Sequence, residues 1–273
     1  MDAALPAYIR KFAKVLDALE EDAMVAVITM TGSCCPITTA HCNAFDTARN
    51  ALLGAEGFQK QPNLEQFSEV LGMLSLNSDK HVNEKMASKH EKSVSYAHRA
   101  DLVRLASAEV PWMDFNPGRE HHVIGRLQAE WPHLQFVRFA LNGADDVVKY
   151  RKWKGAGPEH RYITIGRPGF TDKVVQGASS DGVALDQGFF ILVPETSTPE
   201  VADVSSTLVR ELLRAGDRHL GGRGRGRRAF YYLLLATEGT GNGPGCFQGM
   251  SALYPCVGQS RKQSWPQCRG QVL

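Results

Sequence analysis

Residues 24–41 read MVAVITMTGSCCPITTAH and decide the fold. The first seven are apolar or β-branched almost without interruption, which is the pattern of a strand buried on both faces of a parallel sheet. A turn rich in Gly, Ser, Thr and Pro follows, and residues 41–53 then place Phe45, Ala48 and Leu52 on one helical face. Strand, loop and helix together predict one half of a βαβ unit.

The alternation of strand and helix continues along the chain. We expect an N-terminal helix within residues 1–22 and further helices at 96–108 and 121–131, because apolar residues recur there at helical spacing. Further strands are predicted at residues 67–76, 112–115, 135–141, 161–165 and 188–193. Strands that alternate with helices predict an α/β fold, a Rossmann-like doubly wound parallel sheet with helices on both faces.

One domain is expected to hold the whole sheet, over residues 23–216. Residues 217–273 differ in composition from the rest of the chain. GGRGRGRR at 221–228 is rich in Gly and Arg, and the remainder shows no sustained hydrophobic period. We therefore predict an irregular, weakly ordered C-terminal tail. The Gly/Arg tract also allows a different interpretation, an RNA-binding segment on an unrelated fold.

The composition is that of an ordinary globular enzyme, with 273 residues and 31 Lys+Arg against 29 Asp+Glu. Near neutrality argues against a nucleic-acid partner, and the apolar runs are shorter than the ~20 residues that span a bilayer. We expect an intracellular protein, in cytoplasm or nucleus, because the first residues lack a signal-peptide pattern and the six cysteines are interpreted as reduced thiols. The adjacent Cys34 and Cys35 suit no common zinc spacing, and a structural zinc site is the alternative. Whether the chain forms a homo-oligomer stays open.

The loop GSCCPITTAH at residues 32–41 has the features of an anion-binding turn. Gly32 at a strand end allows the backbone to approach a phosphate closely. The helix that follows offers free N–H groups and the positive end of its dipole, and His41 lies in its first turn. The alternative is a plain Gly/Pro turn with a histidine at a helix start.

A second motif, DVSSTLVR at residues 203–210, precedes a helix predicted to turn its leucines and Val209 inward. The hydroxyls of Ser205, Ser206 and Thr207 either cap that helix or bind an anion at its N-terminus. Arg210 has the planar, forked guanidinium that grips phosphate oxygens. The apolar residues expected to face the core are Leu208, Val209, Leu212 and Leu213.

Taken together, the two motifs resemble those of the nicotinamide/nicotinate-nucleotide adenylyltransferase family, within the HxGH nucleotidyltransferase superfamily. GSCCPITTAH is similar to the family's G-S-F-x-P-I-T-x-x-H, and SSTLVR is similar to its I-S-S-T-x-x-R. Thr38 stands where many superfamily members have the first His of HxGH, and His41 is the second. The resemblance implies ATP binding by the following residues, with His41 and Arg210 catalytic: Gly32, Ser33, Thr38, His41, Ser205, Ser206, Thr207 and Arg210.

Weaker similarities lie between the two motifs. Gly143 and Asp145 resemble the family's G-A-D, which implies a contact with ATP. Substrate binding is implied for Lys85, Trp153 and Arg167, where Trp153 stands near a family Trp that stacks on the nicotinamide ring. Several lysines suit the phosphate role, namely Lys80, Lys85 and Lys89, and Lys85 aligns best; the alternative is that this stretch is only a solvated, mobile loop.

The resemblance implies an adenylyltransferase that moves AMP from ATP, with Mg²⁺, onto nicotinamide or nicotinate mononucleotide. The products are the dinucleotide and pyrophosphate. Two alternatives remain: a nucleotidyltransferase of the same superfamily with another acceptor, and a catalytically degenerate nucleotide-binding protein. The second is favoured by the departures at Cys34, Cys35 and Leu208 and by a missing second Trp, replaced by Asn116-Pro117-Gly118.

Overall fold

The computed structural model describes residues 6–58, 61–195 and 205–214 of the chain. Its strands are β1 (Met24–Gly32), β2 (Glu69–Leu76), β3 (Met113–Phe115), β4 (Gln135–Gly143), β5 (Arg161–Ile165) and β6 (Phe190–Val193). Its helices are α1 (Ala7–Leu16), α2 (Thr39–Leu52), α3 (Asp79–Ala87), α4 (Tyr96–Ser107), α5 (His121–Glu130), α6 (Ala144–Tyr150), the 3-10 helix η1 (Lys152–Gly155), α7 (Thr171–Ser180) and α8 (Ser206–Arg214).

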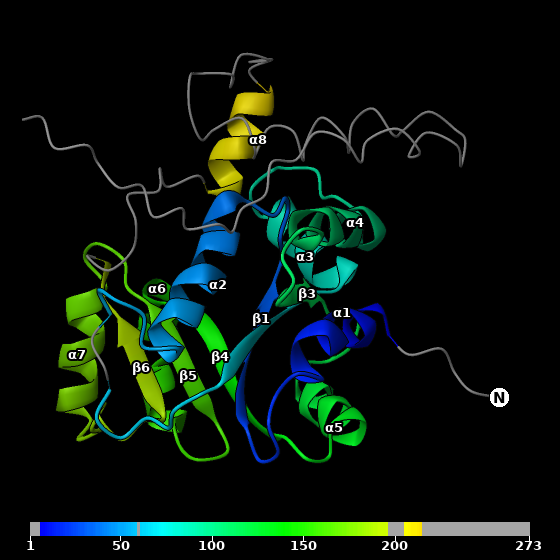
Figure 1. Ribbon diagram of the computed structural model, residues 1–273. Helices are drawn as coiled ribbons and strands as arrows, with labels where there is room; N and C mark the ends of the chain where they lie inside the picture. Colours follow the sequence, from blue (N-terminus) through cyan, green and yellow to red (C-terminus); the bar gives the residue numbers. More distant parts are fainter. Residues whose placement is uncertain (1–5, 59–60, 196–204, 215–273) are drawn as a thin grey trace, which may run out of the picture.

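All six strands are parallel and lie in the order β3-β2-β1-β4-β5-β6. The chain moves outward from β1 to β3, returns to the centre at β4, and moves outward again on the other side (Figure 1). This is the order of a doubly wound, Rossmann-like sheet, so the α/β fold predicted from the sequence is confirmed. The strand order reverses between β1 and β4, the two central strands.

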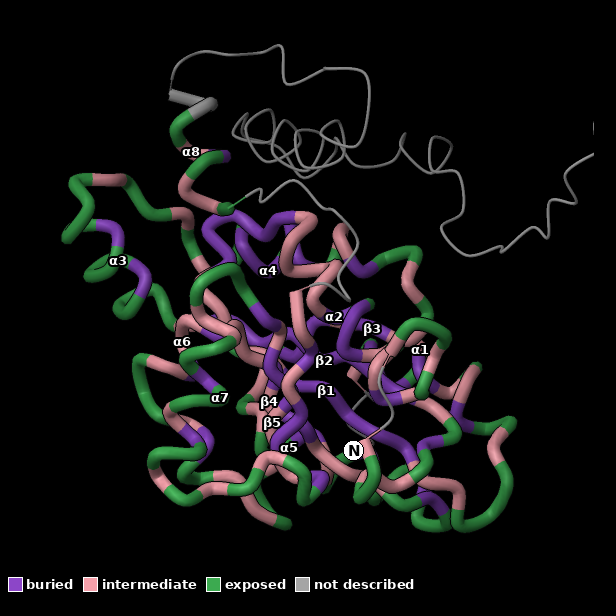
Figure 2. Tube along the Cα trace, turned by 90° about the vertical axis from the view of Figure 1, so that its left-hand side faces the viewer, coloured by how far each residue is buried: buried purple, intermediate pink, exposed green. Residues whose placement is uncertain are grey.

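Helices cover both faces of the sheet, and alternate residues of each strand point to opposite faces. Ala26 and Ile28 of β1 belong to the core under α2 and α4, whereas Val25 and Val27 pack with α1 and α5. On that second face, α6 and α7 cover the β5–β6 half through a separate cluster around Trp153. Figure 2 shows the result, with buried residues along the strands and exposed ones on the outer sides of the helices.

Three α-helices and the short 3-10 helix η1 were not predicted from the sequence. α3 occupies the lysine-rich stretch for which a mobile loop was one alternative, and α6 and α7 flank β5. α8 also differs in detail, because Leu208 is 39% exposed although it was predicted to face inward. Val209, the next residue of the helix, is the one that packs inward, at 3% exposed. The side chains of Leu212 and Leu213, and all of residues 217–273, lie outside the described part.

Candidate functional site

The predicted site lies where the central strands end at their carboxyl edge. Gly32 ends β1 opposite Leu76 of β2, and Gly143 ends β4 opposite Ile165 of β5. The chain leaves β1 toward one face of the sheet and β4 toward the other, which opens the edge between them. In doubly wound folds, ligands bind at this position.

Arg99 of α4 holds the loop that follows β1. Its guanidinium is fully buried and donates to the carbonyls of Ser33 at 2.9 Å and Asn77 at 3.0 Å, and it pairs with Asp79 at 3.0 Å. Its Nε also donates to the carbonyl of Val94 at 3.0 Å. One cation therefore ties the ends of β1 and β2 to the start of α3.

The two adjacent cysteines of the loop are packing residues. Cys34 and Cys35 are buried, and burial raises the pKa of the Cys34 thiol to about 12. Burial likewise raises the pKa of Cys42, in the first turns of α2, to about 11. At neutral pH these two thiols stay protonated and are poor nucleophiles. The described cysteines form no disulfide.

His41 is oriented by the residue that caps its own helix. The backbone N–H of Thr38 donates to Nδ1 of His41 at 3.1 Å, and the Thr38 hydroxyl lies 2.8 Å from the same nitrogen. Since Nδ1 accepts, the ring proton is on Nε2. Burial lowers the pKa of His41 to about 4, helped by the positive charges of Arg167 and Lys85. The imidazole is thus neutral at pH 7 and keeps Nε2–H as a donor.

Two positively charged side chains, those of Lys85 and Arg167, act on this imidazole. Lys85, near the end of α3, brings Nζ within 3.5 Å of the Ser33 hydroxyl, which also lies 3.5 Å from the amide nitrogen of Asn77. Arg167 follows β5, and its charge reaches His41 as that of Lys85 does. Among the three lysines named from the sequence, the structure places Lys85 at the loop.

Gly143 allows Asp145 and Arg167 to meet over the end of β4. A Cβ atom on Gly143 would lie 2.6 Å from Oδ1 of Asp145 and 3.2 Å from Nε of Arg167. The two side chains form a partly exposed ion pair at 3.4 Å. The glycine is therefore required by close approach, and both charged groups stay at the edge of the site.

The two motifs that are distant in the sequence lie against each other. Ser206 donates its hydroxyl to the carbonyl of Pro36 at 2.8 Å, and Nη1 of Arg210 donates to the carbonyl of Cys35 at 2.7 Å. In Figure 1, α8 stands next to the start of α2. Residues of the two motifs, at 32–41 and 205–210, are therefore in direct contact in the structure.

The four polar residues of the motif at the start of α8, Ser205, Ser206, Thr207 and Arg210, already have partners in the protein. The Ser205 hydroxyl accepts the N–H of Leu208 at 3.1 Å, as a helix cap does. Arg210 pairs with Glu91, and its Nη2 donates to the Thr207 hydroxyl at 3.2 Å. With its side chain 11% exposed, Arg210 anchors α8, and phosphate binding by these residues stays a prediction.

Trp153 is in the core and apart from this group. The ring is 3% exposed, its Nε1 donates to Asp181 at 2.8 Å, and it packs so closely on α7 that a Cβ on Gly177 would lie 2.6 Å from it. The left-handed backbone of Arg151 turns η1 inward and carries the indole under α7. The expectation that Trp153 stacks on a bound ring is not met by this packing.

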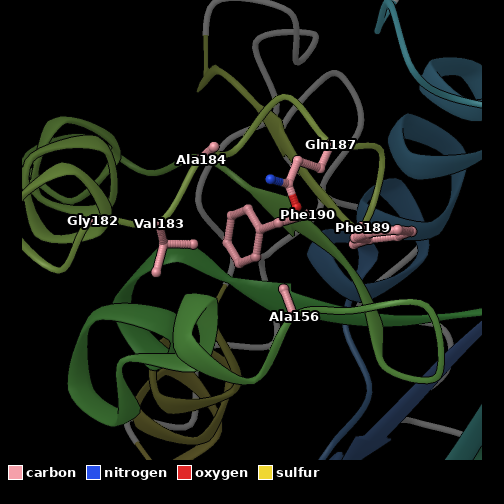
Figure 3. Close-up of a pocket in the computed structure, with 7 residues that line it drawn as sticks. All are labelled: Ala156, Gly182, Val183, Ala184, Gln187, Phe189 and Phe190. Atoms are coloured by element: carbon pink, nitrogen blue, oxygen red, sulfur yellow. The ribbon is translucent and has the colours of Figure 1, made fainter.

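A small pocket lies elsewhere, near the start of β6 and thus at the opposite edge of the sheet (Figure 3). Its volume is about 190 Å³, below the ~300 Å³ at which ligand sites usually begin. Among the described residues, no group of three His, Cys, Asp or Glu side chains is arranged to hold a metal ion. No helix in the same residues is long and apolar enough to cross a membrane.

Comparison with known proteins adds no relative. No model of a protein family matches the chain, and no curated protein matches its sequence. The fold and the carboxyl-edge site define a Rossmann-like α/β protein, and any more specific function has to be argued from the site itself.

Proposed function

We propose that the protein is an adenylyltransferase that moves AMP from ATP onto the 5′-phosphate of nicotinamide or nicotinate mononucleotide. An acceptor phosphate oxygen attacks the α-phosphorus, the new P–O–P bond forms, and the bond to the β-phosphate breaks. Pyrophosphate leaves with the electron pair of that bond. This chemistry needs positioning and charge neutralisation and no covalent intermediate on the protein.

The observation that carries the proposal is the state of His41 at the start of α2. A neutral imidazole with Nε2–H as donor, fixed through Nδ1 by Thr38, suits an oxygen on which negative charge grows in the transition state. The free N–H groups of the first turn of α2 add to this donor. A protonated histidine is not required for such a role.

Two cations support the same interpretation. The positive charges of Lys85 and Arg167 both act on His41, so a phosphate chain beside this ring would meet them as well. Gly32 and Gly143 end β1 and β4 at this edge, and neither adds a side chain of its own there. Mg²⁺ would arrive with ATP, because this ion is usually held by substrate phosphates, water and one or two carboxylates. Asp145 supplies a carboxylate at the carboxyl edge of the sheet.

One alternative is favoured by a specific observation. Arg210 is engaged by Glu91 and by the carbonyl of Cys35, so its guanidinium would have to exchange partners to grip leaving phosphates. A protein in which Arg210 keeps these partners would bind nucleotide without transferring AMP. This reading corresponds to a catalytically degenerate nucleotide-binding protein.

The test combines ATP and Mg²⁺ with each mononucleotide, and follows both pyrophosphate and the dinucleotide. The proposal predicts the two products in equal amounts. Pyrophosphate released only with a different acceptor, such as pantetheine phosphate, would instead assign another transferase of the same kind. Binding of ATP by calorimetry, with no pyrophosphate from any acceptor, would support the non-catalytic alternative and contradict the proposal.

A further inference from the structure

One face of the two central strands changes from apolar to polar in its carboxyl half. On β1, Val25 and Val27 are buried under α1 and α5, but the next residues on the same face are Thr29 and Thr31. On β4, Arg138 stands beside Val27 in the sheet register. Ala140 and Asn142 follow Arg138 on this face of β4 toward the carboxyl edge.

This face is not fully covered, although β4 has a neighbouring strand on each side. Phe139 and Leu141, which point to the opposite face, are buried. Arg138, Ala140 and Asn142 are each partly exposed. A central strand of a doubly wound sheet is normally buried on both faces. The open half of β4 therefore lies between the helix before it, α5, and the helix after it, α6.

Glu120, directly before α5, holds its carboxylate against this strip. The Thr29 hydroxyl donates to Oε2 at 3.3 Å, and the Thr31 hydroxyl donates to Oε1. Nη1 of Arg138 lies 3.5 Å from Oε2. The side chains of Glu120 and Arg138 are only 22% and 21% exposed, so this pair is largely removed from water.

The pair has hydrogen-bonding capacity to spare. A carboxylate offers about four acceptor sites, and a guanidinium has five N–H donors. The 3.5 Å contact is longer than an ordinary N–H···O bond, and Arg138 donates no hydrogen bond to another residue of the described chain. Lys152, the next cation on this face, is already paired with Asp146 at 2.6 Å.

A ligand that satisfies both partners must bring an N–H donor for Glu120 and a carbonyl oxygen for Arg138. A carboxamide supplies both groups in one plane. A carboxylate supplies no donor and would place a second negative charge beside Glu120, where like charges repel each other. The pair therefore matches the amide and disfavours the acid.

We propose that Glu120 and Arg138 bind an uncharged carboxamide on the acceptor, so that nicotinamide mononucleotide is preferred over nicotinate mononucleotide. This inference rests on the proposed function, because it assigns the acceptor's ring to the open half of β4. From Thr29 to Gly32 the strand rises by roughly 10 Å. An acceptor with its phosphate near Gly32 and its ring near Thr29 spans that length.

The experiment measures two quantities for each mononucleotide, the dissociation constant by calorimetry without ATP and kcat/KM for AMP transfer. The proteins compared are the wild type, Glu120→Gln, Arg138→Gln and a control, Arg104→Gln, which removes an exposed ion pair on α4. Thermal unfolding checks that each variant folds. Glu120→Gln keeps the size and the acceptor oxygen of the side chain and thus carries the test if Arg138→Gln does not fold.

The wild type is expected to favour the amide at least about tenfold in both quantities, and Glu120→Gln to bring the ratio close to one by improving the acid. Arg138→Gln is expected to raise KM for the amide about tenfold, with kcat changed much less, and Arg104→Gln to behave as wild type. Equal dissociation constants for both acceptors, or a ratio unmoved by Glu120→Gln, would overturn the inference and leave AMP transfer standing. Selective binding without AMP transfer would instead contradict the proposed function alone, and binding of neither mononucleotide would overturn both.

Discussion

At the scale of single residues, the chemistry of the site depends on which nitrogen of His41 carries the proton. Thr38 settles this by donating its backbone N–H to Nδ1. The same contact closes the first turn of α2, so the residue that caps the helix also sets the tautomer. A neutral donor fixed in this way needs no change of protonation during turnover.

We predict that His41→Ala lowers kcat for AMP transfer by about 10²-fold, the usual cost of losing one preorganised donor. Far-UV circular dichroism is expected to stay unchanged, because the ring is at the edge of the core. His122→Ala, on the exposed start of α5, serves as the control and is expected to retain wild-type turnover. Turnover within twofold of wild type in His41→Ala would remove the residue from the mechanism.

The pKa of His41 also makes a prediction about stability. Burial first, then Arg167 and Lys85, lower this pKa from 6.5 to about 4 in the folded protein. Between these values the unfolded chain binds the extra proton, so stability falls as pH falls through this window. The residue should contribute a loss of about 2 kcal/mol between pH 7 and pH 5. Urea unfolding at both pH values should show a smaller loss for His41→Gln, and identical losses would refute the assignment.

Gly32, Ser33 and His41 could be predicted as site residues from the sequence. They lie between the end of a strand and the first turn of the next helix, where local geometry decides their position. It missed Glu120 and Arg138, although an arginine within the apolar strand QFVRFAL was a visible signal. Their pairing needs residues 18 positions apart to meet on one face of the sheet. Such a contact depends on the register between β1 and β4.

At the scale of elements, the cluster under α6 and α7 is the clearest correction. Trp153 was expected to bind substrate because it stands near a family Trp that stacks on the nicotinamide ring. Its position in the sequence, however, does not determine on which side of a short helix its ring lies. The structure uses the ring as the centre of a core cluster. Its indole nitrogen is satisfied by Asp181, as a buried tryptophan requires.

We predict that Gly177→Ala destabilises the protein by about 1–3 kcal/mol, the usual cost of overpacking. The added methyl group would meet two ring atoms of Trp153 at 2.6 and 2.7 Å. Gly125→Ala on α5, where a Cβ meets nothing, is the matched control and should not destabilise. The measurement is the free energy of unfolding in urea, and equal values for both variants would show that the ring is not packed in this way.

The attachment of α8 gives a further prediction. Arg210 pairs with Glu91 and also donates to the carbonyl of Cys35, so its removal breaks two of the contacts that attach α8 to the protein. In Arg210→Ala, hydrogen exchange at residues 205–211 should accelerate at least about tenfold while β1 and β4 stay protected. Arg210→Lys should restore little of the protection, because the single ammonium group of lysine cannot contact three partners as the planar guanidinium of arginine does. Unchanged exchange in Arg210→Ala would mean that other contacts hold the helix.

Strands were easier to predict than helices in this chain. β1 and β2 are buried along most of their length and consist mainly of apolar or β-branched residues, so their composition alone identifies them. β4 buries Phe139 and Leu141 on one face. α3 and α7 bury only two residues each, Val82 with Met86 and Val174 with Ala178. Two buried residues in nine or ten give too weak a period to distinguish a helix from a polar loop.

At the scale of the whole molecule, the parallel sheet follows from the alternation of elements, but the meeting of distant loops does not. The reversal between β1 and β4 brings the ends of residues 24–32 and 135–143 together at the carboxyl edge. The contacts of α8 with Cys35 and Pro36 then bring a third segment to the same edge. Only the assembled fold unites these three segments.

We propose that residues 32–41 and 205–210 both bind the triphosphate of one ATP molecule. Hydrogen exchange measured with and without ATP and Mg²⁺ tests it most directly, with the pocket residues 182–190 at the far edge of the sheet as an internal control. We expect slower exchange in both segments at the same ATP concentration and no change in the control. Protection of only one segment, or of neither, would contradict it.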